Sequence, residues 1–128
     1  MSGVGPGLFL LVAAAGGLGA VARFVLDGTI RARVGARLPW GTITINLTGS
    51  FLLGLVTGLA AAHLVSAPTQ LVLGTGFLGG YTTFSTASME TVALVREGRI
   101  GAALGVALGT LAGGTAAAAL GLAAGALV

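Results

Sequence analysis

Residues 76–90 read GFLGGYTTFSTASME, the densest polar stretch of a 128-residue chain that is otherwise largely apolar. Two adjacent glycines followed by a run of hydroxyl side chains predict a poorly continuous helix. A break in a membrane helix frees backbone carbonyl and amide groups, which is tolerated only where protein buries them or they line a cavity. Freed carbonyls can hold a hard cation such as sodium, whereas helix N-termini and hydroxyl groups favour anions. The stretch therefore favours ion handling over packing alone.

The composition of the chain is typical of a membrane protein. Hydrophobic residues make up 55% of it, charged residues only 7%, and the mean hydropathy is +1.06. A water-soluble domain carries about a quarter charged residues, so six basic and three acidic side chains cannot cover a surface that faces water. The arginines form no basic stripe for nucleic acid, and the absence of cysteine excludes disulfides and thiolate chemistry.

Four apolar stretches are long enough to cross a bilayer, since a crossing helix needs roughly 20 residues. They lie at about residues 7–26, 42–64, 69–95 and 100–127. The first lacks the positive segment of a cleaved signal peptide and is interpreted as a retained span. The sequence thus predicts an all-α integral membrane protein of one domain, residues 1–128, with four helices running alternately up and down and the third broken mid-membrane.

The arginines predict the orientation of these spans. Five of the six fall in the first and third connections, and none falls in the second connection or at either terminus. By the positive-inside rule those two connections are cytoplasmic and both termini lie outside a multi-pass cell membrane. The five are Arg31, Arg33, Arg37, Arg96 and Arg99.

Small residues recur at every fourth position of the last span, from Gly101 to Gly125. Such stripes let helix backbones approach closely in lipid, where no hydrophobic force drives helices together. The stripe predicts close packing of this span against its neighbours.

Polar groups within the spans are candidates for an ion pathway. Thr42, Asn46 and Ser50 share one face of the second span, where they serve either an anion or a hydrogen bond between helices. Arg23 lies near the end of the first span, where it either snorkels to the interface or has a structural or anion-attracting role. Glu90 lies beyond the break, where it could pair with an arginine.

Three blocks of sequence resemble the fluoride ion channel family (Fluc/CrcB). They are residues 16–23 (GGLGAVAR), residues 39–51 (PWGTITINLTGSF) and residues 76–86 (GFLGGYTTFST), and residues 97–99 (EGR) also fit. The third block is the most specific, and the likeness extends over nearly the whole chain.

The resemblance implies a passive, fluoride-selective channel that exports fluoride and so lowers its toxicity in the cell. It implies a dimer of two antiparallel subunits in the lipid bilayer, with fluoride pathways along the interface and a structural, untransported sodium ion at the centre. The backbone carbonyls of Gly79 and Thr82 match the sodium ligands. Arg23 matches the arginine that ends the first block. The expected fluoride pathway combines family positions with the polar groups above: Thr42, Asn46, Ser50, Phe84, Ser85 and Thr110.

Two features of the sequence depart from the family pattern. Ala87 stands where the family commonly has a second phenylalanine, and the fourth span carries only Thr110 and Thr115 as polar groups. A subunit that inserts in both orientations also needs balanced arginines, which this chain lacks. These features lead to the hypothesis of a heterodimer with a second, oppositely oriented family member, instead of a homodimer.

Two alternative functions compete with the channel. A proton-coupled small multidrug transporter needs a carboxylate in the first span, but the first acidic residue, Asp27, lies only at its end. A structural subunit built on glycine packing would leave the polar face of the second span unexplained. An enzyme is not expected, because Glu90 and His63 form no recognisable nucleophile and base.

Overall fold

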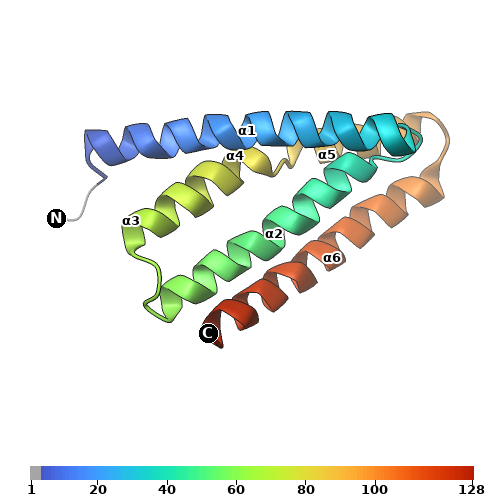
Figure 1. The fold of residues 1–128 in the computed structure, drawn as a ribbon. Coiled ribbons are helices and arrows are strands. Elements are labelled where there is room, and N and C mark those ends of the chain that lie inside the picture. Colours follow the sequence, from blue (N-terminus) through green and yellow to red (C-terminus); the bar gives the residue numbers. More distant parts are fainter. Residues whose placement is uncertain (1–3) are drawn as a thin grey trace.

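Residues 4–128 are described by the computed structural model, and within that range all regular structure is helical. Three long helices dominate, and the segment between the second and third of them is divided into shorter helical pieces (Figure 1). The elements are α1 (Pro6–Val34), α2 (Trp40–Ala61), α3 (Ala67–Gln70), the π-helix η1 (Leu71–Leu78), α4 (Gly79–Tyr81), α5 (Ser85–Arg96) and α6 (Ile100–Ala126).

Within the described part of the chain, the three helices long and apolar enough to cross a membrane are α1, α2 and α6. At most 22% of the most apolar segment of each is buried within the subunit, so most of their apolar side chains face outward. Such a surface requires lipid or another protein around it. The expectation of a helical membrane protein is therefore confirmed, with three helices that qualify as spans on their own.

The ends of α1 follow from local sequence. Pro6 lies in its first turn, where a missing amide hydrogen costs nothing. Gly35 ends it at φ 81°, a left-handed conformation that glycine adopts without a steric penalty. The helix runs beyond the predicted residues 7–26 because Asp27 and Arg31, one turn apart, pair at 3.2 Å and continue it through polar sequence.

The predicted third span, residues 69–95, is interrupted in the subunit. The helical segment formed by α3, η1 and α4 ends at Thr82, whose ψ of 160° turns the backbone to an extended conformation. Helix α5 begins two residues beyond Thr83, whose hydroxyl oxygen accepts the amide of Thr86 at 3.1 Å, as an N-cap does. Residues 82–84 thus form a non-helical segment, which is called the break below.

Glycines permit close packing between α2 and α6. A Cβ atom on Gly121 of α6 would lie 2.0 Å from the Phe51 carbonyl oxygen of α2, and one on Gly54 would lie 2.1 Å from the Ala118 carbonyl oxygen. The predicted stripe on α6 is used over its C-terminal part only, because Gly101 to Gly109 face open space. In Figure 1, α2 and α6 run side by side.

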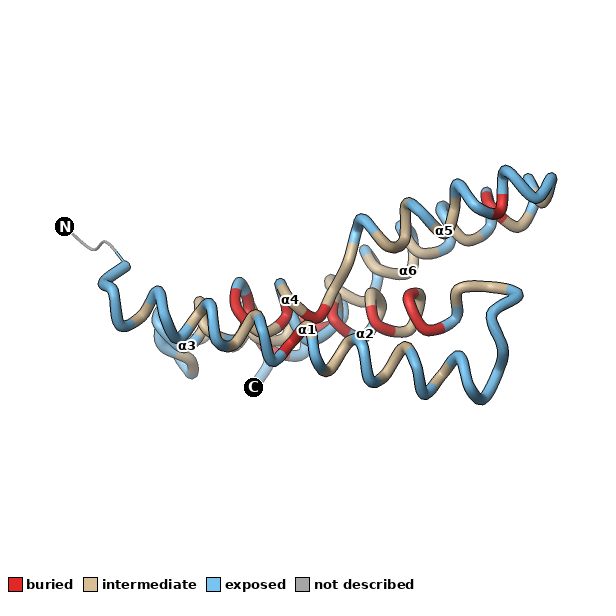
Figure 2. The backbone as a smooth tube through the Cα atoms, turned by 90° about the horizontal axis from the view of Figure 1, so that it is seen from above, coloured by how far each residue is buried: buried red, intermediate tan, exposed pale blue. Residues whose placement is uncertain are grey.

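A cluster of buried residues lies where α1, α2 and α4 meet, as the central red segments of Figure 2 show, and others lie apart from it, such as Leu94 on α5 and Ala103 on α6. Ile45, Leu78 and Tyr81 form the central cluster, with Phe77 stacked on Tyr81 at a ring distance of 6.1 Å. In the same view α5 and the adjoining part of α6 diverge from α1 and α2. This divergence leaves one side of the subunit open.

The two arginine-bearing connections lie at the same end of the molecule, away from both termini (Figure 1). A hydrogen bond ties them together, because Arg99 donates to the carbonyl oxygen of Arg37. The five arginines predicted for the connections thus share one end of the subunit, although Arg31 and Arg33 lie in the last turn of α1 and Arg96 in the last turn of α5.

Candidate functional site

A groove of about 900 Å³ runs along the open side, between α2, η1, α5 and α6. Four of the six residues predicted for the fluoride pathway line it: Asn46, Ser50, Phe84 and Thr110. The break also lines the groove, together with Gly79. The structure therefore brings most of the predicted polar residues to one apolar-walled surface beside the break.

Phe84 is 87% exposed, an unusual state for a large aromatic side chain beside a groove. Ala87, one turn along α5, also lines the groove and presents only a methyl group there. The hydroxyl of Ser85 faces that of Thr83 at 3.4 Å and lies outside the groove lining. In the single subunit the aromatic side of the predicted pathway is thus uncovered.

Both polar atoms of the Asn46 side-chain amide bind the backbone of the break. Its nitrogen donates to the carbonyl oxygen of Thr83 at 2.8 Å, and its oxygen accepts the amide of Thr83 at 2.9 Å. The second hydrogen of the Asn46 amide nitrogen has no hydrogen bond to any residue between 4 and 128. One side chain of α2 therefore replaces the helical partners that Thr83 loses at the break, and one N–H group of Asn46, a residue that lines the groove, has no hydrogen-bond partner among residues 4–128.

The carbonyl groups around the break divide into two kinds. The Gly80 oxygen accepts a hydrogen bond from Nε of Arg23 at 3.3 Å, and the Thr83 oxygen is bound by Asn46. The oxygens of Gly79, Tyr81 and Thr82 accept no hydrogen bond from residues 4–128, and of these three residues Gly79 and Thr82 line the groove. Two unpaired carbonyl groups therefore adjoin its surface.

These two carbonyl groups fit the chemistry of a hard monovalent cation. Unpaired backbone oxygens are the ligands that such cations take in membrane proteins. Two ligands do not complete the coordination of a sodium ion. The set in one subunit is therefore compatible with half of a site whose other ligands come from elsewhere.

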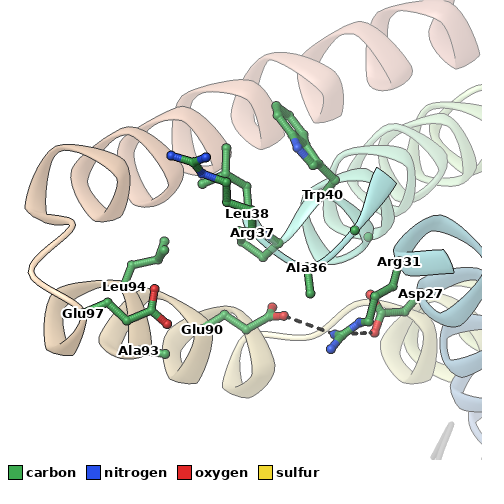
Figure 3. A pocket seen from close by; sticks show the side chains of 13 residues that line it. Asp27, Arg31, Ala36, Arg37, Leu38, Trp40, Glu90, Ala93, Leu94 and Glu97 are labelled. Carbon is green, nitrogen blue, oxygen red and sulfur yellow. Dashed lines mark hydrogen bonds and ion pairs between the residues drawn. The ribbon is translucent and has the colours of Figure 1, made fainter. Parts of the chain in front are cut away.

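Thr42 lies outside the groove, in a polar network at the arginine-bearing end. It is 3% exposed and donates its hydroxyl to Oε1 of Glu90 at 2.5 Å. Oε2 of Glu90 lies 3.6 Å from a guanidinium nitrogen of Arg31, which also pairs with Asp27. Figure 3 shows Arg31 between the two carboxylates, at a pocket of about 200 Å³. The expected pairing of Glu90 with an arginine is present.

Four hydroxyl residues of the groove were not among the predicted site residues: Thr75, Thr83, Ser88 and Thr91. Ser88 and Thr91 follow Phe84 by four and seven residues, so the helical period of α5 was a signal that could have identified them. Thr75 lies in the π-helix, whose wider turn shifts the side-chain register and hides it from a count based on 3.6 residues.

Comparisons with known proteins give a consistent result. The profile of the family described as CrcB-like protein, Camphor Resistance (CrcB), matches residues 10–122. A protein of Leifsonia xyli subsp. xyli named fluoride-specific ion channel FluC 1 is 54% identical over 117 residues, which is 91% of this chain and 85% of that protein. A fluoride-specific ion channel FluC of Thermus thermophilus is 44% identical over 103 residues, 80% of this chain and 82% of that protein. A further relative, FluC 2 of Cutibacterium acnes, is 58% identical over 83 residues, 64% of this chain and 68% of that protein.

Proposed function

The chain belongs to the CrcB family of membrane proteins, and we propose that it is a subunit of a fluoride-selective channel that lets fluoride leave the cell passively. The family is one of ion channels and not of enzymes. The observation that carries the proposal is the groove, which gathers Asn46, Ser50, Phe84 and Thr110 beside the break in a chain similar to named fluoride channels. Amide and hydroxyl groups can solvate a small anion without the full charge that would trap it.

The helical segments on either side of the break cross the bilayer together, as the third of four spans along the chain. Helix α5 has 12 residues and is too short to cross alone, since about 20 are needed. The break then lies within the membrane, where the contacts of Arg23 and Asn46 satisfy backbone groups that lipid could not.

A second subunit covers the groove. The exposed Phe84 and the open side between α2 and α5 both favour such a cover, because lipid cannot satisfy the unpaired carbonyl groups at the break. In the antiparallel dimer that the family resemblance implies, the carbonyls of Gly79 and Thr82 from both subunits supply four oxygens to a central, untransported sodium ion.

The partner is a second family member inserted with the opposite orientation. The five arginines predicted for the connections share one end of this subunit, so the positive-inside rule places that end in the cytoplasm of the cell and both termini outside. The opposite orientation would bring all five across the membrane. Ala87 supports the same partnership, since a pathway that lacks one phenylalanine can take its aromatic groups from the other subunit.

The alternative of a proton-coupled multidrug transporter is not favoured. Its proton carrier would have to be Asp27, which pairs with Arg31 at the arginine-bearing end and lies outside the groove.

Growth in fluoride tests the proposal in cells. A bacterium deprived of its own fluoride exporter should regain growth when it makes this chain together with an oppositely oriented relative. The same pair with Asn46→Ala should restore growth poorly at equal membrane abundance. Failure of both pairs to restore growth, with both proteins present in the membrane, would contradict the proposal.

A further inference from the structure

We propose that Arg23 is a positioning residue of the break: it occupies the carbonyl of Gly80 and thereby leaves the carbonyls of Gly79 and Thr82 free for a cation. The inference deepens the proposed function and rests on the cation site included there. It decides between the two roles that sequence alone leaves open for this arginine, structural support and anion attraction.

Glycines let α1 approach the backbone near Gly80 closely enough for Arg23 to reach it. A Cβ atom on Gly19 would lie 2.0 Å from the Phe77 carbonyl oxygen, and one on Gly80 would lie 2.0 Å from the Gly16 carbonyl oxygen. The backbones of α1 and α4 therefore touch, which no other residue type would permit. Arg23 lies one turn beyond Gly19 on α1, so its side chain meets α4 at its last turn.

Gly80 needs a donor from outside its own helix. In a continuous helix its carbonyl oxygen would accept the amide of residue 84, four positions later. That partner is lost because the backbone becomes extended at Thr82. Nε of Arg23 donates to the oxygen instead, at 3.3 Å. A guanidinium suits this task inside a membrane, because it remains charged and its donors are fixed in a plane.

Arg23 and Asn46 together select which carbonyls stay free. They reach the break from different helices, α1 and α2, and occupy the oxygens of Gly80 and Thr83. Each of these two oxygens directly follows an unpaired one, that of Gly79 and that of Thr82. Fixing the peptide groups at 80 and 83 restrains the neighbouring peptide groups, because each shares a Cα atom with the fixed one. Pre-organisation of this kind lowers the cost of ordering the ligands when an ion binds.

The placement of Arg23 argues against an anion-attracting role within the pathway. Arg23 is half-buried between α1 and α4 and does not line the groove that holds Asn46, Ser50 and Thr110. Its donor is directed at a backbone oxygen of the break. The guanidinium of Arg23 therefore binds a backbone oxygen and does not contact the predicted fluoride pathway.

Sodium-dependent thermal unfolding of the purified, assembled channel tests the inference without measuring flux. Sodium chloride would replace N-methyl-D-glucamine chloride at constant chloride concentration, and the sodium concentration giving half of the stabilisation would be determined. Arg23→Met removes the donor and keeps an apolar chain of similar length. Arg33→Met is the matched control, because Arg33 lies on the same helix, is exposed and makes no hydrogen bond or ion pair with residues 4–128.

The half-stabilising sodium concentration should rise at least about tenfold for Arg23→Met, the factor that loss of a charged hydrogen bond implies, and should not change for Arg33→Met. Arg23→Lys, which keeps a donor but loses the planar fork, should raise it by about threefold. In fluoride efflux from liposomes, excess sodium should restore the flux of Arg23→Met, with the half-saturating fluoride concentration unchanged. If the substitution only loosened the fold, the half-stabilising sodium concentration would stay unchanged.

An unaltered sodium response in Arg23→Met would overturn the inference. So would a raised half-saturating fluoride concentration that excess sodium does not correct, because that result identifies Arg23 as an anion attractor. If Arg23→Met does not fold, the same two measurements, the half-stabilising sodium concentration and the half-saturating fluoride concentration in excess sodium, are made on Arg23→Lys. Flux without any sodium response in the wild type overturns the inference and leaves the proposed channel intact, whereas a sodium response without flux contradicts the proposed function alone.

Discussion

Replacing Asn46 by alanine should separate the two tasks that its amide performs. The substitution removes two hydrogen bonds, at 2.8 and 2.9 Å, that hold Thr83 at the break. Hydrogen bonds between membrane helices average about 0.6 kcal/mol each, with a maximum near 1.7, because the unfolded chain in a membrane also finds partners. The free energy of unfolding should therefore fall by about 1–3 kcal/mol, the upper end applying if both groups of Thr83 stay unpaired.

The fluoride flux should fall by more than this loss of stability explains. Asn46 also lines the groove and keeps one N–H group without a partner among residues 4–128; if this group solvates fluoride, losing the donor corresponds to about tenfold in rate or affinity. The stability is measured by denaturant titration in detergent micelles, and the flux by a fluoride electrode on liposomes holding equal amounts of assembled protein. Thr57→Val on α2 is the control, because its hydroxyl bonds only within the helix and lies outside the groove.

An unchanged flux in Asn46→Ala, with stability reduced as stated, would refute the reasoning about the pathway. Asn46 would then be a packing residue that serves the break alone. An unchanged stability would contradict the paired contact with Thr83 itself.

Three further predictions follow from other contacts. Gly121→Ala should destabilise the subunit by at least about 1 kcal/mol in a denaturant titration, because the added methyl group meets the Phe51 backbone. The chemically identical Gly109→Ala, whose methyl group faces open space, should be neutral or stabilising. Equal effects of the two substitutions would contradict the α2–α6 packing. Thr42→Val should cost about 1.5–3 kcal/mol, because it leaves Oε1 of Glu90 without its buried donor. Combined with Glu90→Met, which removes the acceptor, Thr42→Val should add little further loss, whereas additive losses would argue against the pair. A cysteine added after Val128 in this cysteine-free chain should react with an impermeant reagent from outside the cell only, and labelling of a mixed population would refute the single orientation.

The ends of the first helix show what hydropathy can and cannot predict. Apolar sequence predicted a span to about residue 26, whereas α1 continues to Val34. A count of apolar residues detects the part of a helix that suits lipid. The rest depends on the pair of Asp27 with Arg31 and on the positive φ of Gly35, which are local features of polar sequence.

The sequence predicted which residues belong to the site better than it predicted what those residues bind. The polar face of α2 was visible in the spacing of Thr42, Asn46 and Ser50, but their destinations differ: Glu90, the backbone of Thr83, and the groove. These partners lie 37 and 48 positions away along the chain, so that only the packed helices bring them together. The period of a helix identifies a shared face and does not say what that face meets.

The role of Arg23 could not be predicted for a related reason. The sequence places a charge in a span, and its donor could reach water, an anion or a backbone oxygen. The close approach of α1 to α4, which Gly19 and Gly80 permit, selects the last of these. The glycines were visible in the sequence, but their pairing was not.

Fluoride efflux from liposomes tests the central claim most directly. Vesicles loaded with fluoride, or with chloride as the comparison, would contain the purified chain alone or together with an oppositely oriented relative, and a selective electrode would record release when potassium ionophore is added. Vesicles that contain the pair should release fluoride rapidly and no chloride. Absence of fluoride release from both preparations, or equal release of chloride, would contradict it.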